Sequence, residues 1–201
     1  MSSKRAVLAL KLVLWCAALA PGAWLLAGYS LGWLGPNPIE TLTHVTGMSA
    51  LVILLVTLGV TPVRRLSGWN PVVRLRRPLG LFAFFYAVLH VGVWAVLDLG
   101  LELQWVAEDI VQRPYITVGM AAFTILLPLA VTSTQGWIRR LGRRWSRLHM
   151  LIYAATTLAL VHFYWLVKSD VRLPLMLAGV FALLMAARLP GWLRGRREPT
   201  G

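Results

Sequence analysis

Cysteines and acidic residues are scarce in this chain of 201 residues. Cys16 is the only cysteine, which excludes an intrachain disulfide and a thiolate metal cluster. Charged residues make up 13% of the sequence, whereas a soluble domain carries about 25%. Hydrophobic residues make up 58%, and the mean hydropathy is +0.70. This composition indicates an integral membrane protein, which we expect to form a single transmembrane domain over residues 1–201.

Six apolar stretches are long enough, or nearly so, to cross a bilayer. A membrane-spanning helix needs about 20 predominantly apolar residues. Helices are favoured because they satisfy their own backbone hydrogen bonds in lipid, and the alternation typical of barrel strands is absent. We therefore predict an all-α membrane protein with six transmembrane helices and no internal repeat. The expected spans are residues 12–34, 41–63, 78–97, 114–134, 148–167 and 172–190.

Basic residues gather on one side of the predicted bundle. Seventeen of the 20 lysines and arginines precede the first span, occupy the second and fourth loops, or follow the sixth span. Six of the seven acidic residues fall on the opposite side. The positive-inside rule therefore predicts that both termini are cytoplasmic. Topology and anionic lipid account for the net charge of +13, so no nucleic-acid partner is expected.

Three histidines, His90, His149 and His162, lie within these apolar stretches. An ionisable ring inside a bilayer is expensive and indicates a functional site, and imidazole is a common axial ligand of haem iron. At 1.5 Å per residue, His90 lies roughly 18 Å along its span and His162 about 20 Å beyond His149. His90 and His162 thus share a depth on two helices, which favours a shared cofactor. The alternative is that each ring hydrogen-bonds a neighbouring helix.

The remaining histidines are less clearly functional. His149 lies at the opposite end of its span from His162. Thirteen residues leave an angular offset of roughly 140° on an ideal helix, so these two rings need not share a face. We expect His44, near the start of the second span and at its outer end, to serve packing alone. No span contains a carboxylate, which argues against a proton-coupled transporter.

Four blocks of sequence carry a resemblance to a known family. They are residues 68–81 running on to His90, residues 113–119, residues 128–134, and residues 145–149 running on to His162. These blocks resemble the MsrQ (formerly YedZ) family of membrane subunits, and the similarity extends from about Asn37 to Arg188. This family belongs to the ferric-reductase-like transmembrane superfamily. The resemblance implies a ferric-reductase-like helical bundle that binds b-type haem, with His90, His162 and His149 as its iron-associated histidines.

The resemblance also implies a function. Family members carry electrons from the cytoplasmic side or the quinone pool across the bacterial inner membrane. The acceptor is MsrP, a periplasmic molybdopterin enzyme that repairs methionine sulfoxide in oxidised proteins. The chain would then be an electron-transfer subunit with no catalytic residue of its own, and FMN is a further implied cofactor. The alternatives are a self-contained haem-containing ferric or quinone reductase, and a membrane protein without redox chemistry.

The sequence departs from the wider superfamily at one ligand position. Superfamily members with two haems place another histidine about thirteen residues before the position of His90. Here that region reads Arg76-Arg77, so an inner haem lacks one ligand. Three roles stay open for His149: it binds iron together with a partner other than histidine, it contacts a flavin, or it transfers protons. The flavin and nucleotide domain of those proteins is also missing, so electrons are expected from a separate cytosolic flavin reductase or from quinol.

Overall fold

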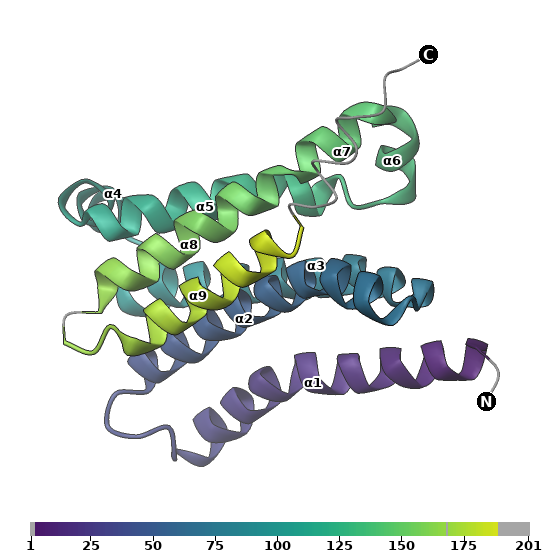
Figure 1. Cartoon of the computed structure of the whole chain (residues 1–201). Coiled ribbons are helices and arrows are strands. Elements are labelled where there is room, and N and C mark those ends of the chain that lie inside the picture. Colours follow the sequence, from purple (N-terminus) through teal and green to yellow (C-terminus); the bar gives the residue numbers. More distant parts are fainter. Residues whose placement is uncertain (1–2, 168, 189–201) are drawn as a thin grey trace.

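A computed structural model describes residues 3–167 and 169–188, and every regular element in these ranges is a helix (Figure 1). Five helical stretches are long and apolar enough to cross a membrane. The predicted all-α membrane fold is therefore confirmed. The α-helices are α1 (Ser3–Leu31), α2 (Pro38–Ser67), α3 (Arg76–Gly92), α4 (Leu103–Gln112), α5 (Pro114–Val131), α6 (Gln135–Leu141), α7 (Arg143–His149), α8 (Leu151–Leu166) and α9 (Arg172–Ala186).

The long helices run back and forth through the bundle (Figure 1). A 3₁₀ helix, η1 (Asn70–Leu75), leads into α3, and a π-helical segment, η2 (Val93–Asp98), follows it. The short helix α4 lies at one end of the bundle, whereas α6 and α7 lie at the end that holds the start of α1 (Figure 1). The sixth predicted span corresponds to α9, which has 15 residues and is shorter than the other five. Residues 189–190 of that span lie outside the described residues, as do Lys168, Arg194, Arg196 and Arg197.

Local sequence explains where the central helix α2 begins and ends. The side chain of Asn37 accepts a hydrogen bond from the backbone N–H of Glu40, and Pro38 occupies the first turn, where its missing N–H is not needed. Gly68 ends the helix in the left-handed region at φ +67° and donates its N–H to the carbonyl of Arg64. These signals set the two ends of α2.

Two helix pairs, α2 with α3 and α5 with α8, make the most extensive contacts in the described part of the chain. The pairs correspond to each other when the sequence is shifted by 72 residues. Gly-Met-Xaa-Ala occurs at residues 47–50 and again at 119–122, and Ile-Leu-Leu occurs at 53–55 and 125–127. Ala83 and Ala155, also 72 residues apart, are both fully buried. The prediction of no internal repeat was therefore wrong, because the shared residues are confined to a few positions in a varied apolar background.

Helix α1 is joined to α3 by one buried hydroxyl group. Pro21 lies within α1, and the N–H of the next residue, Gly22, donates to the Tyr86 hydroxyl at 3.0 Å. The Tyr86 hydroxyl in turn donates to the Ala18 carbonyl at 2.6 Å. Tyr86, which is fully buried, thus joins α3 to two backbone groups of α1 on either side of the proline. Most other α1 side chains are exposed apolar groups, as expected for a helix facing lipid.

Candidate functional site

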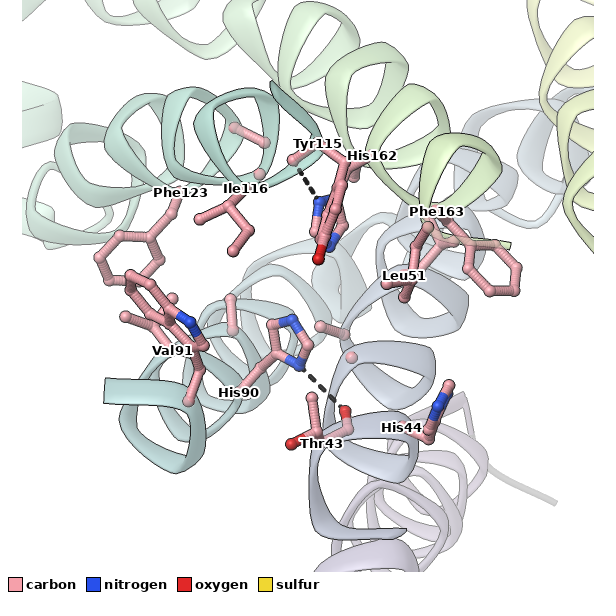
Figure 2. Close-up of a pocket in the computed structure, with 18 of the residues that line it drawn as sticks. Thr43, His44, Leu51, His90, Val91, Tyr115, Ile116, Phe123, His162 and Phe163 are labelled. Carbon is pink, nitrogen blue, oxygen red and sulfur yellow. Dashed lines mark hydrogen bonds between the residues drawn. The ribbon is translucent and has the colours of Figure 1, made fainter. Parts of the chain in front are cut away.

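A cavity of about 400 Å³ lies between the two helix pairs, towards the end of the bundle that carries α4. Its walls are mainly apolar and include Leu51, Ile116, Phe123 and Phe163 (Figure 2). Cavities of this size and character are typical of buried small-molecule and cofactor sites.

His90 from α3 and His162 from α8 both point into this cavity (Figure 2). Their ring centroids are 6.1 Å apart, and the ring planes are inclined by 79°. The equal depths predicted from the sequence thus correspond to two imidazoles that meet across one cavity.

Each imidazole is fixed by a hydrogen bond to the neighbouring helix. His90 Nδ1 lies 3.0 Å from the Thr43 carbonyl of α2, and His162 Nδ1 lies 2.6 Å from the Tyr115 carbonyl of α5. A carbonyl only accepts, so each Nδ1 carries the proton and Nε2 keeps its lone pair. A metal-binding histidine commonly has this arrangement, because the second hydrogen bond sets both the tautomer and the ring orientation.

Each imidazole ring packs against a glycine of the neighbouring helix, His90 against Gly47 of α2 and His162 against Gly119 of α5. A Cβ atom at Gly47 would lie 2.9 Å from His90 Nδ1, and one at Gly119 would lie 2.7 Å from His162 Nδ1. Each glycine comes four residues after the carbonyl that holds the ring. Both rings therefore occupy space that any larger residue at these two positions would fill.

The two facing imidazoles fit a metal ion whose other ligands come from a cofactor. Within residues 3–167 and 169–188, no group of three or more His, Cys, Asp or Glu side chains is placed to hold a metal. An imidazole nitrogen binds a transition metal at about 2.0–2.1 Å, so two imidazoles on opposite sides of one ion place these nitrogens about 4 Å apart. The facing rings of His90 and His162 and the apolar walls suit a metal held in a planar organic ring, as in haem.

The outer rim of the cavity is polar and is tied to α4. Asp109 of α4 accepts a hydrogen bond from Trp94 Nε1 at 3.2 Å and pairs with Arg113 Nε at 3.2 Å. Trp94, in the π-helical segment η2, and Arg113 both line the cavity. A hydrogen bond with the Tyr115 side chain, and secondarily the charge of Asp109, raise the pKa of Arg113, which therefore stays cationic. A cation at this rim can pair with an acidic substituent of a bound group.

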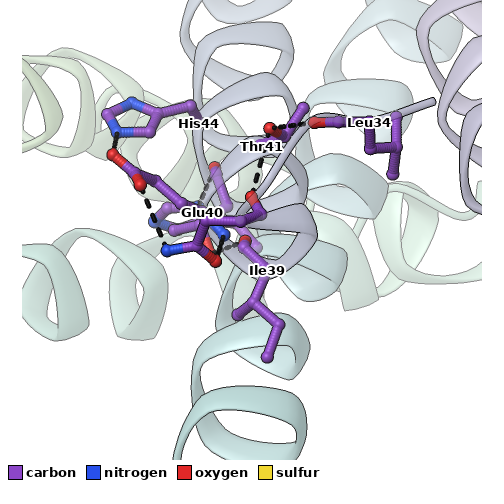
Figure 3. Close-up of polar contacts among 8 residues, drawn as sticks. Leu34, Ile39, Glu40, Thr41 and His44 are labelled. Carbon is purple, nitrogen blue, oxygen red and sulfur yellow. Dashed lines mark hydrogen bonds and ion pairs between the residues drawn. The ribbon is translucent and has the colours of Figure 1, made fainter. Parts of the chain in front are cut away.

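His44 lies at the same rim but is largely exposed. Its Nε2 lies 3.8 Å from a carboxylate oxygen of Glu40, whose other oxygen accepts from the Asn37 amide (Figure 3). The Thr41 hydroxyl donates to the Leu34 carbonyl at 2.9 Å and fastens the preceding loop (Figure 3). His44 thus belongs to a surface network at the start of α2, and its partner Glu40 comes from the same helix instead of from a neighbouring one.

His149 lies apart from the cavity, at the opposite end of the bundle. Its ring stacks on Trp145 with centroids 3.9 Å apart, and its Nδ1 lies 3.1 Å from the Trp145 carbonyl. Its Nε2 lies 3.5 Å from the Ser133 hydroxyl. His90 and His162 correspond to each other when the sequence is shifted by 72 residues, whereas His149 corresponds to Arg77. The repeat therefore gives His149 no second histidine as a partner.

Sequence reasoning missed the residues that position the two rings. Gly47 and Gly119 sit in the repeated Gly-Met-Xaa-Ala motif, and that repeat was the signal that could have identified them. Thr43 and Tyr115 act through backbone carbonyls, which any residue type could provide. The contacts of Asp109 with Trp94 and Arg113 depend on the fold of the loop and have no sequence signature.

Comparison with known proteins identifies the family. Residues 42–160 match the ferric reductase like transmembrane component family. The chain is 50% identical over 189 residues to the "Protein-methionine-sulfoxide reductase heme-binding subunit MsrQ" of Xanthomonas axonopodis pv. citri, covering 91% of this chain and 87% of that protein. It is 47% identical over 195 residues to the protein of the same name from Bordetella pertussis, covering 96% and 94%. No solved structure matches the chain. The chain therefore belongs to the MsrQ family of ferric-reductase-like membrane proteins.

Proposed function

We propose that this chain binds a b-type haem between His90 and His162 and carries electrons across the bacterial inner membrane. The observation that carries the proposal is the pair of imidazoles that meet in one apolar cavity, each with Nδ1 bound to a carbonyl and Nε2 available. The names of the MsrQ relatives support haem as the ligand. Haem iron held by two imidazoles supplies a one-electron carrier.

The chain's own residues would hold the cofactor and set its surroundings. His90 and His162 fix the iron from two helices, and the apolar walls exclude water, which influences the reduction potential. Arg113 at the rim offers a cation for a propionate. Electron transfer of this kind breaks no bond, so no nucleophile or general base is needed on the chain.

The acceptor in this proposal is MsrP, a periplasmic molybdopterin enzyme that reduces methionine sulfoxide. The relatives are named as subunits of a methionine sulfoxide reductase. The positive-inside rule supports cytoplasmic termini, and the haem cavity would then lie close to the periplasmic end, beside α4. The donor would act at the opposite, arginine-rich end, as either a cytosolic flavin reductase or membrane quinol.

A transfer experiment tests this function. The purified protein, with its haem reduced, is mixed rapidly with the periplasmic reductase and a methionine sulfoxide substrate, and haem absorbance is followed. With the periplasmic reductase present in catalytic amount, we expect complete reoxidation of the haem only when the methionine sulfoxide substrate is also present. Rapid reoxidation by ferric chelates or quinone, with none by the periplasmic reductase, would instead establish a self-contained ferric or quinone reductase.

A further inference from the structure

Four arginines meet at the end of the bundle opposite the haem cavity. Arg64 and Arg65 lie in the last turn of α2, Arg76 begins α3, and Arg188 follows α9. Arg76 and Arg188 hydrogen-bond Thr61 and Leu58, which lie about one turn apart on α2, so the two guanidinium groups lie beside the same part of that helix. The acidic residues of the described chain all belong to the other end, around α4, at the end of η2, in the first turn of α2 and in the loop before α9. The four guanidinium groups therefore have no described carboxylate among them.

Arg188 is the most deeply placed of these four cations. Its side chain is only 6% exposed. It donates hydrogen bonds to the Tyr153 hydroxyl and to the Leu58 carbonyl, and it lies over the Tyr153 ring, 5.3 Å from the centroid. Its Nε is buried and has no hydrogen-bond partner within the described residues. Burying a charge without a counter-charge is costly, so a nearby anion would stabilise this arrangement.

Arg76 is the half-buried member of the cluster and borders the surface. It donates to the Thr61 hydroxyl, and it occupies the first residue of the 17-residue helix α3. Arg65 is already engaged, because its Nη1 donates to the Ala187 carbonyl at 3.2 Å at the end of α9.

We propose that the Arg76–Arg188 cluster is a binding site for a phosphate group. The guanidinium fork matches the oxygens of a phosphate, and two such groups can compensate its charge. At 1.5 Å per residue, the 30 residues of α2 span about 45 Å, so its ends reach the depth of lipid headgroups. The phosphate could belong to an anionic phospholipid or to a soluble phosphate compound. The site involves neither His90 nor His162 and does not depend on the proposed electron transfer.

Thermal unfolding of delipidated protein in detergent tests the site with three probes, namely phosphatidylglycerol, phosphatidylcholine and inorganic phosphate. We expect phosphatidylglycerol or inorganic phosphate to raise the unfolding temperature, and phosphatidylcholine to have a smaller effect. Arg76→Gln and Arg188→Gln should each weaken this binding about tenfold, because each removes a charged hydrogen-bond donor. Arg139→Gln, at an exposed arginine of α6, is the matched control and should bind like the unmodified protein.

Competition between the probes identifies the source of the phosphate. If excess inorganic phosphate fails to displace phosphatidylglycerol, the site takes a lipid headgroup. If inorganic phosphate stabilises the protein and displaces the lipid, the site takes a soluble phosphate compound. Arg188→Gln alters a buried residue, so Arg76→Gln decides the outcome if Arg188→Gln fails to fold.

Three results would overturn the proposal. The first is that neither phosphatidylglycerol nor inorganic phosphate stabilises the protein. The second is that Arg76→Gln and Arg139→Gln bind these probes equally well. The third concerns Glu198, the one acidic residue that follows α9 in the sequence and lies outside the described residues. If Glu198→Gln destabilised the protein as much as Arg188→Gln did, with no change in phosphate binding, the counter-ion would be a carboxylate of the chain itself.

Discussion

His90 and His162 are held in the same way by two corresponding helix pairs. Each Nδ1 bonds a backbone carbonyl 47 residues earlier in the chain, His90 that of Thr43 and His162 that of Tyr115. The repeat thus presents two imidazoles to one cavity from two helix pairs that face each other. A metal between them would receive one ligand from each half of the repeat.

Enlarging the glycine beside either histidine should disturb the cavity. We expect Gly119→Ala to push the His162 ring away from the Tyr115 carbonyl and to lower haem affinity by about 10- to 100-fold, as removal of a supporting interaction does at metal sites. Haem retention during purification, measured by absorbance per chain, checks this. Gly80→Ala in α3 is the matched control, because a Cβ there meets nothing within 4 Å. Equal retention in both variants would contradict the positioning role of Gly119.

Removing the Tyr86 hydroxyl should loosen α1. Tyr86→Phe removes the hydroxyl that bonds the Ala18 carbonyl and the Gly22 N–H, which we expect to destabilise the docking of α1 by about 1–2 kcal/mol. Hydrogen exchange of the α1 backbone around Pro21 measures this opening. Tyr164→Phe, at an exposed tyrosine, should leave the exchange unchanged. Unchanged protection in Tyr86→Phe would show that the hydroxyl bridge contributes little.

The orientation of the chain can be tested by labelling. In a Cys16→Ser background, Glu102→Cys beside α4 should react with an impermeant maleimide in intact cells, whereas Arg143→Cys in α7 should react only after the membrane is opened. This follows from the arginine-rich end being cytoplasmic. The reverse pattern would place the haem cavity at the cytoplasmic end and exclude a periplasmic acceptor.

The exposed acids around α4 should favour docking of the acceptor. Glu102 and Glu108 are exposed, whereas Asp109 is held inward by Trp94 and Arg113. Neutralising Glu102 and Glu108 together should slow electron transfer several-fold at low salt and weaken its salt dependence, because complementary charge accelerates encounter. Asp170→Asn, at an exposed acid of another loop, is the control. An unchanged rate would leave these two acids with a role in topology alone.

The sequence predicted the membrane class because long apolar runs and segregated arginines report directly on burial in lipid. The shared depth of His90 and His162 followed from the predicted span bounds, the common direction of the two spans and the helix rise. The surroundings of His149 could be obtained only in part: Trp145 lies one turn earlier in the same helix α7, whereas the contact of His149 Nε2 with Ser133 depends on how α7 packs beside the end of α5. Gly47 and Gly119 were missed because a glycine in a helix has many explanations until the ring that packs against it is known.

The most direct test of haem binding between His90 and His162 is the spectrum of single-histidine variants. The purified protein should contain a low-spin b-type haem with two imidazole ligands, seen by absorbance and electron paramagnetic resonance. His90→Ala and His162→Ala should each abolish that signal, and His44→Ala should retain it in full. An unshifted low-spin spectrum at full occupancy in either His90→Ala or His162→Ala would contradict the account.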